Sequence, residues 1–540
     1  MGIAISGSDR DAAEASHPPS GGIGIDLSSR VDEILCRRPS VGLAVAVVRN
    51  GRIEEFEGRG FANLQTRRPI SEDTVFRIGS ITKTITALAV LQLWEQGSVD
   101  LDAPASEYLR SYRLLMAEPE FRPPTLRHLL THTAGIPDAR RFVDLLDIGA
   151  GPWDARVPVR SVPFGQPLPS LATEYAPGLE VVAQPGSAFA YSNHGFATLG
   201  QVVEDVTGMP LDRYLRERIF LPLGMDSTDL IRTHSLAARL AEGYVLTSAG
   251  PRTVDDRDWL GSGAGGAYST VRDLSRYAAA LARGGANDHG FVVRPETQAT
   301  MFERHYQTDP ALPAMGLGFF VTDVDRRRVV AHDGILPGFN SHLSLVPESG
   351  IGLIALTNGS TGAMRWLPQE ADDLLRRLMG AEREQPVPAV AHHPEIWSDI
   401  VGRYALPPRV SDLRGRLAMG GGLEVFVGGG RPMLRLRLPV PALWNGLPLQ
   451  PDDAADPMAF QVDLAPFGMG RVRLRFRRDR TRGTTLMHTD LGGQPISFQP
   501  VAAGDRRRSR ALLVAALTGV AVAARRSRRC GPSRDRRLRG

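Results

Sequence analysis

The chain of 540 residues is long enough for about three domains of ~150 residues, although larger single domains are common. A composition of 42% hydrophobic and 23% charged residues is that of an ordinary globular protein. The net charge of +5 is misleading, because residues 505–540 hold 12 Arg and 2 Asp and leave the rest of the chain at −5. This acidic body, whose Arg-rich runs lack interleaved aromatic residues, excludes a nucleic-acid groove. Cys36 and Cys530 lie near opposite ends, so no structural disulfide and no cysteine zinc site is expected.

The first 30 residues are rich in Gly, Ser, Ala and Asp and are predicted to be disordered. Residues 1–20 contain no apolar stretch long enough for a secretion signal, and the myristoylation-like start Met1-Gly2 is short enough to arise by chance. A helix is expected from Val31 to Leu35. The apolar residues 41–48, the turn dipeptide Asn50-Gly51 and residues 52–58 then predict a hairpin.

The next stretch of the chain alternates helices and strands. The spacing of Ile85, Leu88 and Leu93 predicts a helix over residues 81–96, and Gly97 provides its stop. Further helices are expected at 195–207, 211–219 and 367–378, and strands at 329–332, 342–347 and 352–357. Strands at both ends of this segment, with helices between them, predict one α+β domain over residues 31–382 whose first and last strands share a sheet.

Residues 383–395 contain three prolines and are predicted to link this domain to a second one over residues 396–502. Short alternating strands separated by glycine runs predict a small antiparallel β-barrel there, with strands at 423–427, 433–438, 460–464, 472–476 and 485–488. Arginines alternate with apolar residues on these strands, which favours a solvated outer face over an anion-binding site: Arg435, Arg437, Arg473 and Arg475.

The tail, residues 503–540, contains a 14-residue run of mostly small apolar residues at 511–524 between arginine clusters. As a helix this run would span about 21 Å, short of the ~30 Å hydrocarbon core, although snorkelling arginines could extend it. The alternatives are membrane contact through residues 506–529 and a frayed tail. Without a signal peptide, the body of the protein is expected in the cytoplasm, either free or attached to a membrane by this tail.

A single lysine, Lys83, occurs in the chain, and the other 63 of its 64 basic residues are arginines. Lysine offers an amine that can lose its proton near neutral pH when its surroundings depress its pKa, which arginine cannot do. Lys83 follows Ser80 by three residues at a predicted helix start, so both side chains lie on one helix face. A nucleophile and its proton acceptor need this arrangement, and the helix dipole favours a developing alkoxide.

Two further short motifs, called boxes below, complement the Ser80–Lys83 pair. Tyr191-Ser192-Asn193 places a phenol beside an amide, which could shuttle a proton and position a substrate carbonyl. His332-Asp333-Gly334 lies on a predicted strand, where the glycine admits a substrate backbone and the following N–H, of Ile335, could help to bind an oxyanion.

For the other candidate residues the sequence context favours structural roles. His128 and His132 have a metal-ligand spacing, but no Glu follows His128 as in H-E-x-x-H, so local packing is the favoured interpretation. His194 is expected either to support the neighbouring tyrosine box or only to pack locally. No G-x-S-x-G elbow occurs, which argues against an α/β-hydrolase. The Pro- and Gly-rich residues 138–184 are expected to form loops over the pocket.

Over about residues 31–380 the chain resembles the serine β-lactamase and penicillin-binding protein superfamily, in its class C-like and esterase-like branch. The resemblance rests on the three boxes and on four further segments, at residues 125–135, 185–193, 220–226 and 265–270. It implies a domain with an antiparallel sheet flanked by helices and an all-α subdomain. It also implies that Ser80 forms an acyl-enzyme and that no metal or organic cofactor is required.

The same resemblance implies the role of each site residue. Lys83 and Tyr191 would share the proton of Ser80, Asn193 would hold substrate and orient Lys83, and the N–H groups of Ser80 and Ile335 would bind the oxyanion. Penicillin-recognising members usually carry a lysine where this chain has His332. A mostly neutral histidine disfavours an anionic β-lactam or a terminal D-Ala carboxylate, and Asp333 adds a negative charge unless its side chain points away.

The sequence therefore favours a serine hydrolase of small esters or amides with esterase-like activity. The enzymatic alternatives are a β-lactamase, a DD-peptidase and a D-amino acid peptidase. A catalytically silent sensor or scaffold of the same fold is the non-enzymatic alternative, and the intact Ser80, Lys83 and Tyr191 argue against it. The sequence does not indicate the oligomeric state.

Overall fold

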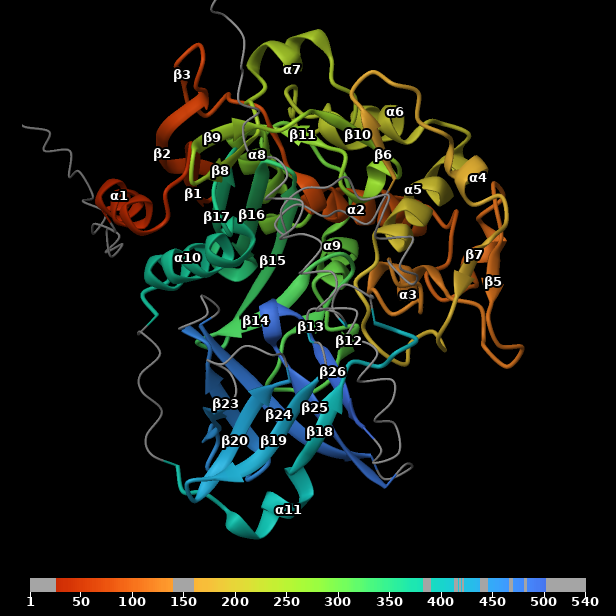
Figure 1. Cartoon of the computed structure of the whole chain (residues 1–540). Helices are drawn as coiled ribbons and strands as arrows, with labels where there is room; N and C mark the ends of the chain where they lie inside the picture. Colours follow the sequence, from red (N-terminus) through yellow and green to blue (C-terminus); the bar gives the residue numbers. More distant parts are fainter. Residues whose placement is uncertain are drawn as a thin grey trace, which may run out of the picture.

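The computed structural model describes residues 26–138, 160–381, 390–411, 416, 419, 422–437, 445–465, 470–479 and 483–501 (Figure 1). Most of the predicted linker and the whole C-terminal tail beyond Val501 lie outside these ranges. Among the described residues, no helix combines the length and the hydropathy needed to cross a membrane.

The first helix, α1 (Leu27–Arg37), begins before the position predicted for it. Asp26 caps it by accepting a hydrogen bond of 3.0 Å from the Ser29 backbone N–H, and Leu27 and Val31 are buried. Residues 27–30, which the composition assigned to a disordered N-terminus, therefore belong to the folded chain. Their polar appearance reflects a helix that buries only one face.

A nine-stranded antiparallel sheet forms the centre of the larger domain, in the order β12-β13-β14-β15-β16-β17-β1-β2-β3. The N-terminal strand β1 pairs with the late strand β17, from Leu43 opposite Thr357 to Arg49 opposite Ile351, so the two ends of the domain share one sheet as predicted. The strands are β12 (Tyr306–Gln307), β13 (Ala314–Met315), β14 (Phe320–Val324), β15 (Arg327–Leu336), β16 (Phe339–Val346), β17 (Ile351–Thr357), β1 (Gly42–Arg49), β2 (Arg52–Asn63) and β3 (Arg68–Pro69).

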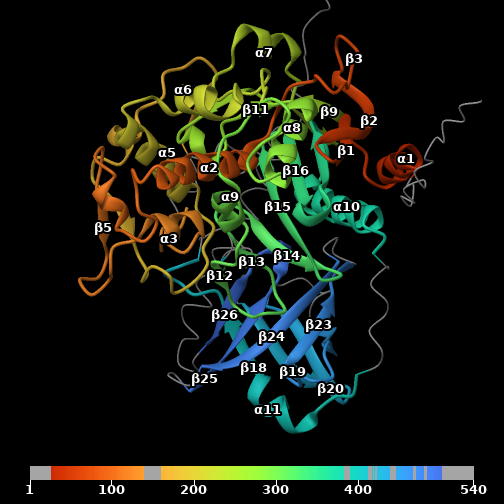
Figure 2. The ribbon, with the colours of Figure 1, turned by 180° about the vertical axis from the view of Figure 1, so that it is seen from behind.

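Both faces of this sheet are covered, which explains why β1 reads as a continuous apolar run. Ala44, Ala46 and Val48 point into the core with the helical region, whereas the alternate residues Leu43 and Val45 point into a second core. That second core is closed by α1 and α10 (Ala363–Leu378), which lie together on one side of the sheet (Figures 1 and 2). On the other face, α8 (Val271–Ala282) packs against β1 and β17.

The helical region surrounds α2 (Thr82–Glu95). Every residue of α2 from Thr82 to Leu93 is buried, so the helix is enclosed on all sides instead of burying one stripe. Gly97 ends it with a φ of +72°. The other helices of the larger domain are α3 (Leu126–Leu130), α4 (Leu171–Glu174), α5 (Asn193–Thr207), α6 (Leu211–Leu215), α7 (His234–Arg239) and α9 (Pro295–Met301). The short helix α11 (Trp397–Ile400) lies beside the barrel (Figure 1).

Two details of the helical region differ from the sequence prediction. The helix predicted over residues 211–219 divides into α6 and a π-helical turn, Arg216–Phe220. Short two-stranded pairs, which the sequence analysis did not identify, connect the helices: β4 (Phe76–Arg77) with β11 (Tyr268–Ser269), β5 (Leu114–Met116) with β7 (Leu179–Val181), β6 (Ser161–Pro163) with β10 (Arg257–Trp259), and β8 (Tyr244–Thr247) with β9 (Gly250–Thr253).

The C-terminal domain is a nearly closed antiparallel barrel, in the order β21-β20-β19-β18-β26-β25-β24-β23-β22. Its terminal strands, β21 and β22, are separated in sequence by Leu449 alone, so the two ends of the sheet must lie close together. The strands are β18 (Gly402–Ala405), β19 (Leu423–Gly428), β20 (Arg431–Leu436), β21 (Leu447–Pro448), β22 (Gln450–Pro451), β23 (Ala459–Asp463), β24 (Arg471–Asp479), β25 (Thr484–Thr489) and β26 (Ile496–Pro500).

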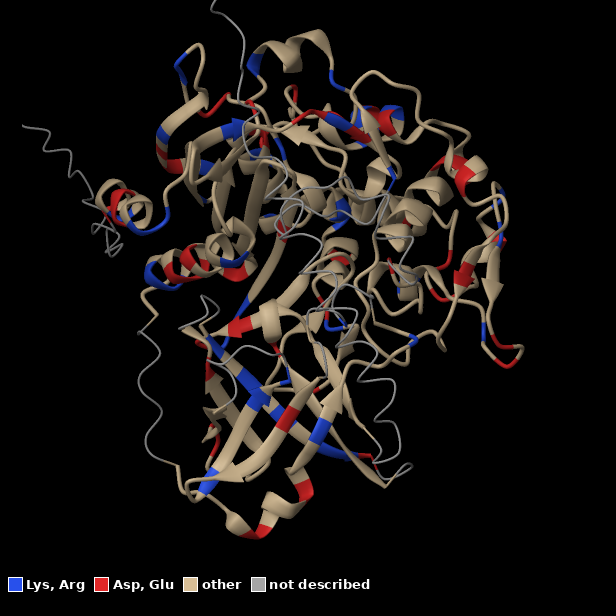
Figure 3. Cartoon of the chain, in the orientation of Figure 1, with Lys and Arg blue, Asp and Glu red and all other residues tan. Residues whose placement is uncertain are grey.

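The arginines of the barrel do not all lie on a solvated face, and the prediction is wrong for Arg475. Its side chain is only 5% exposed and lies 2.5 Å from Asp452 and 3.9 Å from the buried Asp309 of the larger domain. Its neighbour Arg477 contacts Asp309 at 2.6 Å. Figure 3 shows basic residues along β24, which crosses the barrel diagonally. The larger domain therefore contacts the barrel at Arg475 and Arg477 through Asp309.

Candidate active site

Ser80 lies in a single 3₁₀ turn, Gly79–Ile81, which precedes α2 and is held against strand β15. Gly79 has a φ of +51°, and a Cβ at this position would lie 2.8 Å from the backbone N of Ile335, so neither the conformation nor the space suits a side chain. The Ser341 hydroxyl donates to the carbonyl of Ile78 at 2.8 Å. These contacts place the N–H groups of Ser80 and Ile335 on adjoining segments, as a shared oxyanion site requires.

Lys83 follows one turn later, and three oxygen atoms surround its amine. Nζ lies 2.9 Å from Ser80 Oγ, 2.6 Å from Asn193 Oδ1 and 2.5 Å from the carbonyl O of Ala264. A neutral amine has two N–H donors and one lone pair. If the donors serve the amide and carbonyl oxygens, which can only accept, the lone pair is left facing the hydroxyl of Ser80. The arrangement therefore suits removal of the Ser80 proton.

The electrostatics of Lys83 favour the neutral amine near physiological pH. The side chain is fully buried, and this desolvation lowers its pKa to about 7, although the negative charge of Asp138 opposes the shift. The burial of the chain's only lysine thus brings its pKa close to neutral pH, where a general base works best.

Tyr191 lies beside this pair, just before α5. The Lys83 amine is 4.9 Å from the centre of the Tyr191 ring. The ring of His132 stacks against Tyr191 with centroids 4.3 Å apart, and its Nδ1 accepts a hydrogen bond of 3.0 Å from the Ser192 backbone N–H. Burial and the nearby Lys83 hold the pKa of His132 well below its ordinary value, so it is a neutral platform for the tyrosine.

Asn193 is the first residue of α5, and Ser192 caps this helix through the backbone N–H of Gly195. Its amide is fixed by Asp138, which the sequence analysis assigned only to a loop. Asp138 accepts hydrogen bonds from the Asn193 backbone N–H at 2.5 Å and from its Nδ2 at 2.6 Å. With Nδ2 engaged in this way, the Asn193 Oδ1 must point at Lys83, so Asp138 acts on the site through Asn193.

The third box lies on β15, where alternate side chains point to opposite faces. His332 is 2% exposed, its Nδ1 is hydrogen bonded to the carbonyl of Asp333, and burial and Lys83 lower its pKa to about 4. The Asp333 side chain instead pairs with His342 of β16 at 2.7 Å on the face beneath α10. Gly334 is needed because an added Cβ would lie 2.0 Å from the carbonyl O of Ile78.

The remaining histidine candidates have structural partners. His128 Nδ1 accepts a hydrogen bond of 3.1 Å from the Thr125 backbone N–H in a helix cap, whereas His132 lies under Tyr191. His194 is hydrogen bonded to the Tyr175 hydroxyl at 2.6 Å and contacts the Asp138 backbone, so it supports the loop that carries Asp138. Within the described ranges, no cluster of His, Cys, Asp and Glu is suited to hold a metal ion.

The comparisons with known proteins agree with this geometry: the chain is a serine hydrolase. It belongs to the beta-lactamase family, whose model matches residues 28–375. The esterase EstB of Burkholderia gladioli is 30% identical over 367 residues, which cover 62% of this chain and 89% of that protein. Penicillin-binding protein 4 of Amycolatopsis lactamdurans is 30% identical over 363 residues, covering 65% and 88%.

One solved structure extends the likeness of the fold to the barrel. An octameric penicillin-binding protein homologue from Pyrococcus abyssi superposes with a TM-score of 0.57 at 24% identity and covers 88% of this chain and 100% of that one. The penicillin-binding protein of Bacillus halodurans, with a TM-score of 0.52 at 25% identity, covers 66% of this chain and 100% of its own. The first likeness therefore reaches beyond the residues that the family model matches.

Proposed function

We propose that the protein hydrolyses small esters or amides through an acyl-enzyme on Ser80. The observation that carries this proposal is the buried Lys83 amine, 2.9 Å from the Ser80 hydroxyl with a pKa lowered to about 7. Lys83 takes the proton of Ser80 as Oγ forms a bond to the substrate carbonyl carbon. The N–H groups of Ser80 and Ile335 bind the resulting oxyanion, a contribution of about 3 kcal/mol per donor.

The second half of the reaction assigns a role to Tyr191. Tyr191 and Lys83 return the proton to the leaving alcohol or amine as the bond to the carbonyl carbon breaks. Tyr191 then helps a water molecule to attack the acyl-enzyme, which releases the acid and restores the Ser80 hydroxyl. Asn193 keeps the amine aimed at Ser80, and Asp138 holds Asn193.

The preference for a neutral substrate rests on His332. A group with a pKa of about 4 carries no charge at pH 7, so it offers no cation to the carboxylate of a β-lactam or of a terminal D-Ala. The carboxylate of Asp333 does not contribute to this argument, because it points to the opposite face of the sheet. The similarity to EstB supports esterase activity.

A second candidate is cleavage of D-Ala peptides or β-lactams, and the similarity to penicillin-binding protein 4 favours it. The test compares turnover of p-nitrophenyl butyrate, a D-Ala anilide and nitrocefin by the full chain, with Ser80→Ala as the inactive control. We expect p-nitrophenyl butyrate to have the highest kcat/KM. Efficient turnover of nitrocefin with negligible turnover of the ester would overturn the esterase proposal.

Replacing Lys83 with Arg tests the role of the amine directly. The substitution replaces an amine that can lose its proton with a guanidinium that stays protonated. We expect the acylation rate to fall about 10²–10⁴-fold, the usual contribution of a general base, while circular dichroism shows a retained fold. Trapping of the acyl-enzyme by intact-protein mass spectrometry measures the step. Wild-type acylation in Lys83→Arg would show that the proton leaves Ser80 by another route.

A further inference from the structure

The loop that carries Tyr191 is held from two sides. On one side, the backbone N–H groups of Ala190 and Ser192 donate to His132, at 2.8 Å to its carbonyl O and at 3.0 Å to its Nδ1. On the other side, the backbone N–H of Phe189 donates to the Tyr306 hydroxyl at 3.2 Å. The backbone around the Tyr191 phenol is therefore attached to two separate segments of the chain.

Phe189 also contacts the rings that surround the active site. Its ring centre lies 5.8 Å from that of His132 and 6.2 Å from that of Phe320 on β14. The ring centre of Phe320 in turn lies 5.6 Å from that of His332. Aromatic rings interact favourably at separations of roughly 4.5–7 Å. Movement of Phe189 would therefore disturb His132, on which Tyr191 stacks, as well as the backbone next to Tyr191.

Tyr306 lies on β12, and the turn that follows this strand contacts the barrel domain (Figures 1 and 2). Asp309, in the turn between β12 and β13, accepts a hydrogen bond of 3.0 Å from the Ala311 backbone N–H. The same carboxylate, with a side chain 2% exposed, lies 2.6 Å from Arg477 of the barrel. The residue that holds Phe189 is thus joined by one short turn to a buried contact between the domains.

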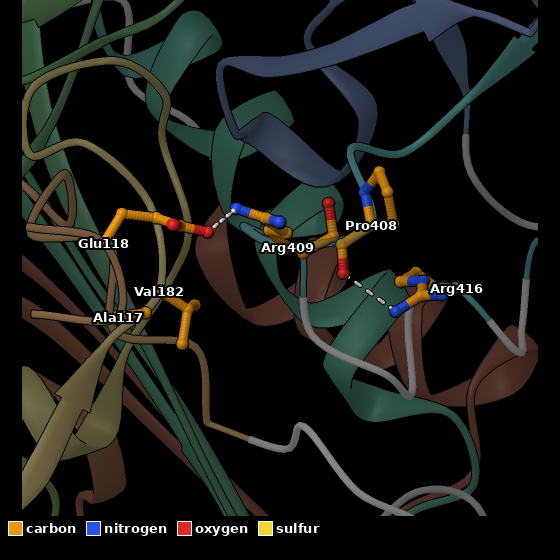
Figure 4. A pocket seen from close by; sticks show the side chains of 7 residues that line it. Ala117, Glu118, Val182, Pro408, Arg409 and Arg416 are labelled. Atoms are coloured by element: carbon orange, nitrogen blue, oxygen red, sulfur yellow. Dashed lines mark hydrogen bonds and ion pairs between the residues drawn. The ribbon is translucent and has the colours of Figure 1, made fainter. Parts of the chain in front are cut away.

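The barrel contacts the larger domain at a second place, where Arg409 pairs with Glu118 at 2.6 Å (Figure 4). The Arg409 side chain is 67% exposed. An exposed pair contributes little to stability, because water already solvates both charges. The buried contact at Asp309 is therefore the better candidate for a link between the barrel and the active site.

We propose that Tyr306 positions Tyr191 and that the barrel, through Asp309, holds Tyr306 in place. The inference rests on the proposed function, in which Tyr191 helps a water molecule to attack the acyl-enzyme. Without the Tyr306 hydroxyl, the Phe189 N–H loses its acceptor and the loop loses one of its two attachments. A small displacement of a catalytic group slows the step that this group serves.

Hydrolysis of p-nitrophenyl butyrate by Tyr306→Phe separates this role from a general loss of stability. Because p-nitrophenolate leaves as an anion, acylation of Ser80 needs little help from Tyr191, whereas deacylation needs it. We expect kcat and KM to fall together, each about tenfold, with kcat/KM unchanged. The acyl-enzyme should accumulate in intact-protein mass spectra. Partial unfolding would instead lower kcat and leave KM unchanged.

Tyr108→Phe is the matched control and should leave kcat and KM unchanged. The half-buried Tyr108 hydroxyl also accepts a hydrogen bond from a backbone N–H, that of Asp100 at 2.9 Å, in the segment that follows α2. Hydrogen exchange measured by mass spectrometry gives a readout that needs no turnover, and we expect faster exchange over residues 185–192 in Tyr306→Phe. A wild type that forms no acyl-enzyme would overturn the proposed function, whereas exchange would still report the attachment by Tyr306.

Asp309→Asn tests the part played by the barrel, with Asp323→Asn at an exposed ion pair as its control. We expect Asp309→Asn to change kcat, KM and exchange in the same direction as Tyr306→Phe, and Asp323→Asn to match the wild type. Wild-type kcat and exchange in a Tyr306→Phe protein that circular dichroism shows to be folded would overturn the proposal. Wild-type values in Asp309→Asn alone would overturn the part assigned to the barrel.

Discussion

Lys83 is the only lysine among 540 residues, and its buried environment favours the uncharged amine by lowering its pKa to about 7. Because a general base must be neutral, the proposed reaction is inactive while Lys83 is protonated. We expect kcat/KM for p-nitrophenyl butyrate to rise about tenfold per pH unit below pH 7 and to level off above it. A profile measured with the free enzyme reports this pKa. A flat profile from pH 5 to 8 would contradict the assignment.

A substitution of Asp138 tests whether this residue positions Asn193 or only stabilises the folded protein. Its charge raises the pKa of Lys83 against desolvation, and its oxygens hold the Asn193 amide. In Asp138→Asn we expect a lower kcat, because Asn193 is no longer fixed. We also expect the rising part of the kcat/KM–pH profile to shift to lower pH, because the negative charge that raises the pKa of Lys83 is gone. A variant that is merely less stable would lose activity without moving the rising part, so the pH profile distinguishes the two roles.

At the scale of elements, β15 places His332 and Asp333 on opposite faces of the sheet by the alternation of its side chains. His332 faces the active site, and Asp333 faces α10 and pairs with His342. A one-residue shift in the register of β15 would exchange them and place a carboxylate beside Lys83. The pairing with β16, from Val330 opposite Leu345 to Leu336 opposite Phe339, fixes this register.

The Asp333–His342 pair predicts a pH dependence of stability. Burial opposes the charge on His342, but the hydrogen bond and charge of Asp333 and the charge of Asp372 on α10 outweigh it, so the pKa of His342 is raised above 6.5. Because the pKa of His342 is higher in the folded state than in the unfolded state, protonated His342 stabilises the protein at pH below 6.5. This stabilisation is lost as the pH rises through the folded-state pKa of His342. We expect Asp333→Asn to lower the melting temperature by a few degrees at pH 5.5 and by less at pH 9.

Calorimetry at the two pH values provides the measurement, and Asp325→Asn, at an exposed turn of the same sheet, is the control. An equal effect of Asp333→Asn at both pH values would show that the pair contributes no titratable stability.

At the scale of the whole molecule, buried ion pairs join the barrel to the larger domain. Asp309, with a side chain 2% exposed, contacts Arg477 at 2.6 Å and Arg475 at 3.9 Å on β24. In Asp309→Asn, Arg475 keeps Asp452 at 2.5 Å and Arg477 keeps Asp456 at 2.8 Å, so the loss is smaller than the about 3–5 kcal/mol of a fully uncompensated buried charge. We expect Asp309→Asn to separate the thermal unfolding of the barrel from that of the larger domain, measured by scanning calorimetry.

Asp323→Asn is the matched control, because Asp323 pairs with Arg304 at 2.6 Å on an exposed surface. Exposed pairs contribute about 0–1 kcal/mol, so this variant should retain a wild-type transition. Equal effects of the two substitutions would show that Asp309 does not hold the domains together.

Much of the architecture could be predicted from local patterns. The apolar run of β1, the Asn50-Gly51 turn and the alternating barrel strands are short-range signals, and the structure contains each of these elements. The part played by Asp138 and the burial of Arg475 escaped prediction. Both depend on contacts between residues far apart in the chain, Asp138 with Asn193 and Arg475 with Asp309, and no local pattern indicates such a contact.

The sequence by itself determined the chemical groups available to this protein: one amine, a hydroxyl three residues before it, and a phenol, an amide and a histidine in separate boxes. Their types and spacings, with the family resemblance, were enough to predict a serine hydrolase. Only the tertiary structure decided the charge state of those groups and the direction in which they point. The pKa of Lys83 depends on its burial among distant segments, and the side on which Asp333 lies depends on the register of β15 with β16.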